Sequence, residues 1–426
     1  MIKRNNKKGF TIVELVIVIA VIAILAAVLI PTFSGIIRKA NISADTQLVK
    51  NMNTALAADE AINGKPDSFS DVIAIVRDAG YVLSAFNPTT EGCYVAWDKE
   101  NNQLLLIDGK DDKFDVIYSV KEPSASENWY FAVDSEEAKQ ALKNHYGETV
   151  KIEMALTNVD VLVDTINKDG AQELYVDESL VISADKVIDV NNENASVTLK
   201  FGGASLTTDG TIAKIPLNVT KGQLTVEDAV VGGAGEFTNE HGTFSTAVGF
   251  DGNSKLTLDG CNIRGTGNAV AGSNKDDGPA EVTIIDCTLS SDEVGFQLAT
   301  WGTATLTNTN IDCPNPFFAS YGAVINVESG KYNSTSDCMF EMHGNTTSAP
   351  EGRKVTTINV KGGEFTFNTL AIFASSTSST NAKIVITGGT FNGANYLEYF
   401  ATEAAKNAIT GGATISISGN TVTITK

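Results

Sequence analysis

The hydrophobic and polar positions divide this chain into an N-terminal part with helical spacing and a long C-terminal part with strand-like spacing. Residues 10–30 form an almost unbroken apolar run. Across residues 34–63, apolar side chains recur mostly at steps of three and four with charged side chains between them, which predicts an amphipathic helix. Gly64 and Pro66 supply a signal that ends a helix. We therefore predict one long helix over residues 10–63.

The apolar run is compatible with a cleaved secretory signal, a plain membrane anchor or an assembly helix. As a helix it would measure about 31 Å, just enough to cross the hydrocarbon core of a bilayer. The leader, residues 1–9, carries four cations and no anion, which holds it on the cytoplasmic side and exports the rest. Ala26-Ala27 could serve as a secretory cleavage site, but the run is long for that purpose. Glu14 argues against a plain anchor, because an unpaired carboxylate inside a bilayer costs about 3 kcal/mol.

The residues around Glu14 resemble the signal of type IV pilins and the related pseudopilins. The motif reads Gly9-Phe10-Thr11-Ile12-Val13-Glu14-Leu15, with lysines before it and the apolar run after it. The resemblance implies that a prepilin peptidase cuts between Gly9 and Phe10 and methylates the new amino group of Phe10. It also implies that Glu14 pairs with the Phe10 amine of a neighbouring subunit, in a filament of identical or different subunits. Two such opposite charges offset part of each other's desolvation in an apolar bundle.

Pro31 falls where such pilins commonly have a proline that loosens or kinks the helix. After the helix, residues 64–121 are predicted to form a small α/β head. Within it, residues 69–79 favour a short helix, and residues 93–97 and 103–107 favour two strands of a hairpin. A helix followed by an antiparallel hairpin is similar to the head of a pilin.

A connecting region is predicted at residues 122–172, with a polar linker at 122–128 and helices at 135–146 and 158–169. The pattern then changes. Residues 173–426 are rich in Thr, Val, Ile, Gly and Asn and nearly free of helix signals.

A repeated unit runs through this C-terminal region. It reads apolar-x-apolar, two turn-like residues, a small residue, any residue and an apolar residue. The intervals between copies are unequal, which is typical of a solenoid whose coils have loops of different lengths. A sandwich or an antiparallel barrel would instead have hairpin turns between neighbouring strands. The unit resembles the rungs of right-handed parallel β-helices of the pectin-lyase-like kind. The copies begin at Leu224, Leu256, Val282, Ala304, Ile325, Ile358 and Ile384.

The predicted fold class is therefore α+β. A long N-terminal pilin helix with a small α/β head is followed by a mostly-β right-handed parallel β-helix. Cys261 and Cys287 fill the small position of successive copies, which favours core packing over a disulfide, because parallel side-chain directions make that bond awkward. The five cysteines show no metal-ligand spacing, and we expect neither a metal nor a cofactor.

Charge excludes one class of partner. The chain has 31 basic and 51 acidic side chains, for a net charge of −20. Without the four cations of the leader, 27 and 51 remain, or −24. So acidic a surface disfavours binding to nucleic acid, because phosphates would be repelled.

Catalysis is an alternative, because many β-helices cut acidic polysaccharides with clustered carboxylates and a basic side chain. The repeat region contains only Arg264 and Arg353, with His241 and His343, and its lysines are scattered. Asp276-Asp277 is predicted to be a solvated turn. We therefore predict a protein that is not an enzyme, with a surface polysaccharide lyase or hydrolase as the alternative.

The predicted function is a cell-surface type IV pilin-like subunit. It would be anchored once in the cytoplasmic membrane, with its C-terminus outside, and then be assembled into a pilus. The β-helix would serve adhesion or recognition of surface glycans, or of host or cell-wall polymers. A pseudopilin of a type II secretion-like system is a further alternative. Candidate ligand contacts are aromatic residues on the loops, each of which could equally lie in the core: Trp301, Tyr321, Tyr396 and Tyr399.

Overall fold

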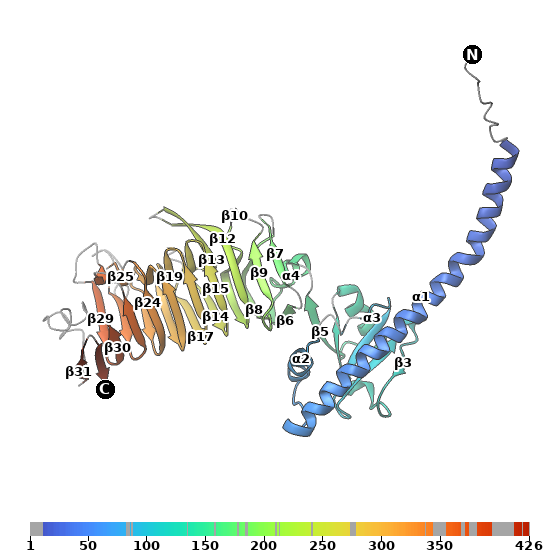
Figure 1. Ribbon diagram of the computed structural model, residues 1–426, viewed down its shortest axis with the longest axis horizontal. Coiled ribbons are helices and arrows are strands. Elements are labelled where there is room, and N and C mark those ends of the chain that lie inside the picture. Colours follow the sequence, from blue (N-terminus) through green and yellow to red (C-terminus); the bar gives the residue numbers. More distant parts are fainter. Residues whose placement is uncertain are drawn as a thin grey trace, which may run out of the picture. The chain divides into compact units, whose positions relative to one another are not determined.

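The structure is a computed structural model, and the chain divides into two compact units, Met1–Ile152 and Glu153–Lys426. Figure 1 draws the described residues as ribbons. These are residues 12–81, 86, 88–133, 135–156, 159–176, 179–183, 186–208, 211–212, 214–239, 242–272, 278–336, 338–343, 355–367, 371–374, 381–393, 413–419 and 421–425.

The first unit begins with a single long helix, α1 (Ile12–Asn63), which confirms the predicted helix and continues through Pro31. The two halves of α1 differ in their surroundings. Large apolar side chains in the first half are exposed, whereas Val49, Met52 and Leu56 in the second half are buried. The second half is therefore the part of α1 that packs on its own domain, where it contacts β2 and α2.

The head of the first unit is an antiparallel sheet in the order β3-β2-β1-β4. Trp97 of β1 is fully buried and stacks on Phe69 of α2, with ring centroids 6.1 Å apart. Phe131 of β4 points to the opposite face, where it meets Tyr146 of α3 at 5.5 Å. Helices therefore cover both faces, so the central strands are buried. The elements are α2 (Phe69–Asp78), β1 (Cys93–Asp98), β2 (Gln103–Asp108), β3 (Asp115–Tyr118), β4 (Trp129–Val133) and α3 (Glu136–Tyr146).

This arrangement contains the predicted hairpin, and the region predicted to be a connection supplies β4 and α3 to the head. A buried carboxylate, Asp98, closes the hairpin. Its oxygens accept hydrogen bonds from Ser124 (Oγ at 2.5 Å, backbone N at 3.0 Å), Asn101 and Gln103. Burial would raise the pKa of Asp98, but these hydrogen bonds outweigh it and lower the pKa to about 2.

The second unit is a solenoid of three parallel sheets, in which each coil contributes one strand to each sheet (Figure 1). The first sheet contains β6 (Gly170–Val176), the second halves of β8 (Ile188–Lys200) and β11 (Leu217–Glu227), β14 (Ser254–Asp259), β17 (Ala280–Ile285), β20 (Gly302–Thr307), β23 (Val324–Val327), β26 (Thr356–Val360) and β29 (Ala382–Ile386). The second contains β7 (Leu180–Ile182), β9 (Ser205–Thr208), β12 (Val230–Asn239), β15 (Asn262–Gly265), β18 (Thr288–Ser291), β21 (Thr309–Cys313), β24 (Gly330–Ser334), β27 (Glu364–Phe367) and β30 (Gly389–Asn392).

The third sheet contains the first halves of β8 and β11, then β13 (Gly242–Phe250), β16 (Asn268–Gly272), β19 (Val294–Leu298), β22 (Asn315–Ala319), β25 (Cys338–Met342) and β28 (Ala371–Ala374). At the N-terminal end of the solenoid lie β5 (Lys151–Leu156) and α4 (Val159–Thr165), and β10 (Thr211–Ile212) pairs with β12. At the C-terminal end, β32 (Thr421–Thr425) pairs antiparallel with β30 and with β31 (Thr414–Ser418). This hairpin ends the run of parallel coils.

The seven sequence copies lie in register, one above the next. Leu224 faces Leu256, which faces Val282, and the same row continues to Ile384. These side chains point inward and are buried. The solenoid predicted from the repeat is therefore confirmed.

The small position of the repeat is explained by backbone geometry. In early coils the residue before it takes the left-handed conformation, as at Asp286 (φ 52°) and Asn308 (φ 47°). In later coils the small residue itself takes a positive φ, as at Gly330 (φ 134°), where a Cβ would lie 2.0 Å from the Thr309 carbonyl oxygen. Only the early coils can therefore hold a larger residue in this position.

Cys261 and Cys287 occupy this position in early coils and are buried, as predicted. The backbone N–H of Cys261 donates to Cys287 Sγ at 3.3 Å, and none of the five cysteines, all of which are described, forms a disulfide. Burial raises the pKa of the Cys313 thiol to about 12, so this thiol is held in its protonated, unreactive form.

Aromatic side chains fill the C-terminal half of the solenoid core. Phe365 is fully buried and stacks on Phe391 at 4.7 Å and on Tyr332 at 5.0 Å. Phe340 and Phe317 extend the cluster at 5.8 Å and 5.4 Å between successive rings. Each ring is held by rings from neighbouring coils, which ties these coils into one core.

We predict that Phe365→Ala lowers the free energy of unfolding of the β-helix by about 3–5 kcal/mol, because it leaves a cavity among rings of three coils. Urea unfolding of the full chain in detergent, followed by circular dichroism, would measure this. Thr366→Ala, on the same strand but exposed, is the matched control and should change little. Equal stability of Phe365→Ala and the parent would show that the rings do not hold the coils together.

We predict that Asp98→Asn lowers the free energy of unfolding of the first unit by about 1–3 kcal/mol at neutral pH, because the donors on one carboxylate oxygen then face an NH2 group instead of an acceptor. The folded-state pKa is depressed, so ionised Asp98 stabilises the fold above about pH 4, and this contribution is lost as the pH falls toward 2. The difference in the free energy of unfolding between the parent and Asp98→Asn should therefore shrink by about 2 kcal/mol over that interval. Unfolding of the parent, of Asp98→Asn and of the exposed control Asp115→Asn at several pH values measures this difference. A difference between the parent and Asp98→Asn that does not change with pH would contradict the prediction.

Candidate functional site

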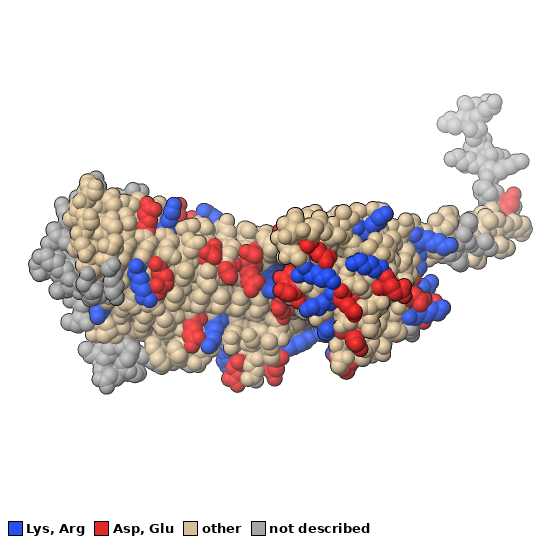
Figure 2. Space-filling view, turned by 90° about the horizontal axis from the view of Figure 1, so that it is seen from below, with Lys and Arg blue, Asp and Glu red and all other residues tan. Residues whose placement is uncertain are grey.

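The first half of α1 presents an uncovered apolar surface. Residues 15–37 include no charged side chain, and Glu14 lies in the first turn of the helix. Ile12 is 80% exposed and Ile37 is 58% exposed. In Figure 2 this stretch carries one acidic group near its end and no further charge before the basic groups. Apolar surface on this scale marks a site of contact with another chain or a membrane.

Some of the functional residues that the sequence predicts in this segment are not among the residues that the structure describes. Gly9 and Phe10 lie outside the described residues, and of Pro31 the structure describes only the helical backbone. Across the residues that are described, no helix is both long and apolar enough to cross a membrane. Cleavage at Gly9, methylation of Phe10, the pairing of Glu14 and a kink at Pro31 stay predictions.

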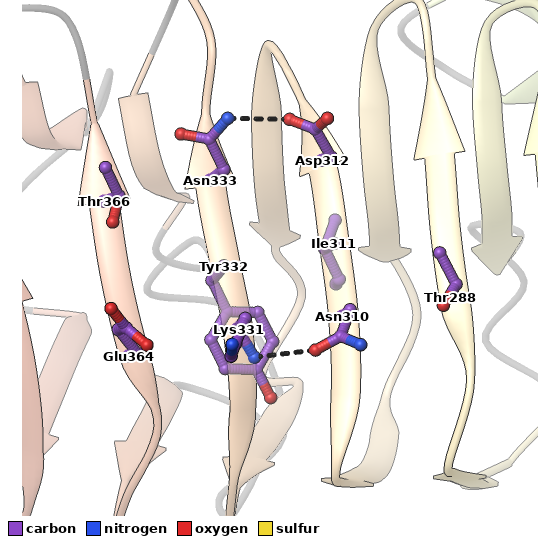
Figure 3. A pocket seen from close by; sticks show the side chains of 9 residues that line it. All are labelled: Thr288, Asn310, Ile311, Asp312, Lys331, Tyr332, Asn333, Glu364 and Thr366. Carbon is purple, nitrogen blue, oxygen red and sulfur yellow. Dashed lines mark hydrogen bonds between the residues drawn. The ribbon is translucent and has the colours of Figure 1, made fainter.

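A polar groove of about 430 Å³ lies on the outer face of the second sheet. Figure 3 shows Asn333 directed toward Asp312 on the neighbouring strand, with Asn333 Nδ2 donating to Asp312 Oδ1 at 2.7 Å. Asn310 Oδ1 likewise accepts from the Lys331 backbone N–H at 3.1 Å. Side chains in this groove therefore bond mainly along the ladder of strands. Its lining is Thr288, Asn310, Ile311, Asp312, Lys331, Tyr332, Asn333, Glu364 and Thr366.

A second pocket, of about 310 Å³, lies on the third sheet and combines an aromatic ring with amides and acids. Gln297, Phe318 and Glu341 are directly opposite one another on β19, β22 and β25. The Phe318 ring stacks on His343, with centroids 5.1 Å apart. We call this the third-sheet pocket. Its lining is Asn268, Glu293, Val294, Gln297, Phe318, Glu341 and His343.

Hydrogen bonds fix the acidic side of the third-sheet pocket. Glu341 Oε1 lies 2.8 Å from His343 Nε2, and Glu341 Oε2 accepts from Asn315 Nδ2 at 2.6 Å. Both oxygens of Glu341 therefore have partners. The carboxylate in turn orients the imidazole that stacks on Phe318.

The amide side of the third-sheet pocket is incompletely satisfied. Asn268 is fully buried, and its Nδ2 donates to Gln297 Oε1 at 2.8 Å. Asn268 Oδ1 has no hydrogen-bond partner. Buried polar atoms without a partner are rare, because each costs about 1–3 kcal/mol. Asn268 Oδ1 is shielded from solvent, so it is not part of the open surface of the pocket.

The predicted aromatic contacts lie elsewhere. Trp301 and Tyr321 are half-buried at the corner between the third and first sheets, and neither lines the groove or the third-sheet pocket. Tyr396 and Tyr399 lie outside the described residues. Sequence reasoning missed Phe318, which stands in β22, because the third-sheet strands share no common motif. The outward-facing residues of these strands pair across the sheet. Because loops of unequal length precede the strands, only an alignment of the strands themselves could have identified the pairs.

Features expected of a polysaccharide-cleaving enzyme can also be located. Arg264 Nη2 lies 3.3 Å from Asp292 Oδ1 as an exposed ion pair that lines neither the groove nor the third-sheet pocket. The groove contains Asp312 and Glu364, and the third-sheet pocket contains Glu293 and Glu341. Within the described ranges, no group of three or more His, Cys, Asp or Glu side chains could hold a metal ion.

Comparison with known proteins bears on the N-terminal segment. The prokaryotic N-terminal methylation motif matches residues 4–30. The N-terminal segment is therefore similar to that of type IV pilins. This pilin-like segment includes Gly9, Phe10 and Glu14, and Pro31 directly follows the match.

Two relatives extend the similarity beyond the motif. The chain is 39% identical over 85 residues to the type IV wide pilus major component PilA4 of Thermus thermophilus, which covers 20% of this chain and 63% of the relative. It is 39% identical over 61 residues to a fimbrial protein of Moraxella nonliquefaciens, which covers 14% of this chain and 39% of the relative. The chain thus spans less than two thirds of the length of either relative. No solved structure matches.

Proposed function

We propose that the chain is a subunit of a type IV pilus or a related pseudopilus. The observation that carries this proposal is the uncovered apolar half of α1, which coincides with the methylation motif and contains a single acid at its start. A helix that buries only its second half in its own domain needs another apolar environment for its first half. A membrane before assembly and a bundle of identical helices after it both supply that environment.

The proposed sequence of events begins in the cytoplasmic membrane. The basic leader stays inside, the head and the β-helix are exported, and a prepilin peptidase removes residues 1–9 and methylates Phe10. Glu14 then pairs with the amine of Phe10 on a neighbouring subunit. This pairing neutralises two charges that would otherwise be costly in an apolar bundle.

The exported β-helix has the proposed role of recognition rather than catalysis. The third-sheet pocket brings together polar groups suited to hydrogen bonding with a hydroxylated surface. Its Glu341 is already bonded through both oxygens. Glycans on cell surfaces or in cell walls are the proposed partners.

We predict that Glu14→Gln reduces the amount of this chain in sheared surface filaments at least tenfold and leaves its amount in the membrane unchanged. The substitution keeps the size of the side chain and removes only the charge that would pair with Phe10. Immunoblots of sheared and membrane fractions measure both quantities. The control Glu127→Gln makes the same charge change at an exposed site on the head and should assemble normally. Normal assembly of Glu14→Gln would contradict the proposed charge pairing.

A further inference from the structure

We infer that the third-sheet pocket binds a sugar ring without a carboxylate, either a neutral hexose or an N-acylated hexosamine. This inference rests on the proposed recognition function and assigns it a site and a ligand class. Three features of the pocket carry it: an amide fixed by a hydrogen bond, an oriented aromatic ring and the sign of its charges.

The amide side of the pocket supplies a polar contact. Gln297 lines the third-sheet pocket, and its Oε1 accepts a hydrogen bond from Asn268 Nδ2 at 2.8 Å. This bond fixes the Gln297 amide, which is suited to a hydrogen bond with a ligand hydroxyl, a group that both donates and accepts. Asn268 Oδ1 is shielded from solvent and is not part of the proposed contact.

The aromatic ring indicates a ligand with an apolar face. Phe318 lines the third-sheet pocket and is half-buried, and His343 stacks on it with an interplanar angle of 29°. His343 is held in turn by Glu341 at 2.8 Å. The ring is therefore fixed in place before a ligand arrives, which lowers the entropic cost of binding. The C–H face of a pyranose is the sugar surface that packs on such a ring.

Charge excludes acidic sugars. The lining contains two carboxylates, Glu293 and Glu341, and neither Lys nor Arg. A uronic acid or another carboxylated sugar would bring a third carboxylate with no Lys or Arg to pair with it, and the one imidazole already contacts Glu341, which is unfavourable in a partly dehydrated pocket. Hydroxyl and amide N–H groups can instead donate to Glu293. The volume of about 310 Å³ is at the small end of ligand pockets, consistent with one ring of a longer glycan.

The groove on the second sheet lacks these features. Its aromatic member, Tyr332, is turned into the core, is 1% exposed and donates through its hydroxyl to the Ser329 carbonyl oxygen at 2.7 Å. Its lining contains one cation, Lys331, together with Asp312 and Glu364. The two surfaces therefore differ in their aromatic ring and in the presence of a lysine, which makes them distinguishable by substitution.

The test presents an array of neutral, N-acetylated and carboxylated oligosaccharides to the full-length chain in detergent, followed by titration calorimetry with the strongest ligand. We expect binding to one or more glycans without a carboxylate. Phe318→Ala and Gln297→Ala should each weaken it at least tenfold. Glu364→Ala, in the groove on the second sheet, is the matched control and should leave the dissociation constant unchanged within twofold. Thermal unfolding of each variant shows whether the fold is retained.

Two results would overturn the inference while recognition itself stands. The first is binding confined to carboxylated glycans. The second is binding that Glu364→Ala weakens and that folded Phe318→Ala and Gln297→Ala leave unchanged. If no oligosaccharide binds, the recognition function falls together with the inference, whereas filament assembly, which Glu14→Gln tests, is unaffected.

Discussion

The structure depends on one constraint, that a single helix must satisfy two different surroundings. The second half of α1 buries Val49, Met52 and Leu56 on its own sheet, whereas the first half exposes apolar side chains on all sides. Helices already occupy both faces of the sheet in the head, and the described apolar side chains of the first half of α1 stay exposed. The proposed membrane and subunit contacts would give this half the apolar surroundings that its own domain does not.

The β-helix suits this role because it adds length without adding a new kind of core. Each coil places apolar side chains at the same inward-facing positions, so it packs through these side chains on the coils before and after it. Stacked aromatic rings in the C-terminal coils add to this packing between neighbouring coils. The outer faces are then free to vary, and two of them form a polar groove and a pocket that combines an aromatic ring with amides and acids.

Some of this structure could be predicted from sequence, and the reasons are specific. The first and second sheets were predictable because a turn of constant length joins them, so Leu256 and Val282 occupy equivalent places in the repeat. The third sheet follows loops of variable length, so the alignment of Gln297 with Phe318 was not visible. Strand β4 was also missed, because Trp129–Val133 is buried and lacks polar alternation.

The candidate ligand contacts show the same limit. Trp301 and Tyr321 stay predicted contacts, whereas the third-sheet pocket is lined by Phe318, a strand residue that sequence alone would assign to the core. What distinguishes Phe318 is its outward direction, set by the register with Glu341. Register in a parallel sheet comes from contacts distant in sequence. By contrast, the motif around Gly9 and Glu14 is local, and sequence suffices to identify it.

The most direct test of the central claim is mass spectrometry of the N-terminal peptide of this chain, isolated from sheared surface filaments. The account predicts a chain that begins at Phe10 and carries an N-methyl group on that residue. A chain that begins at Met1, or one that begins after Ala27, would contradict it.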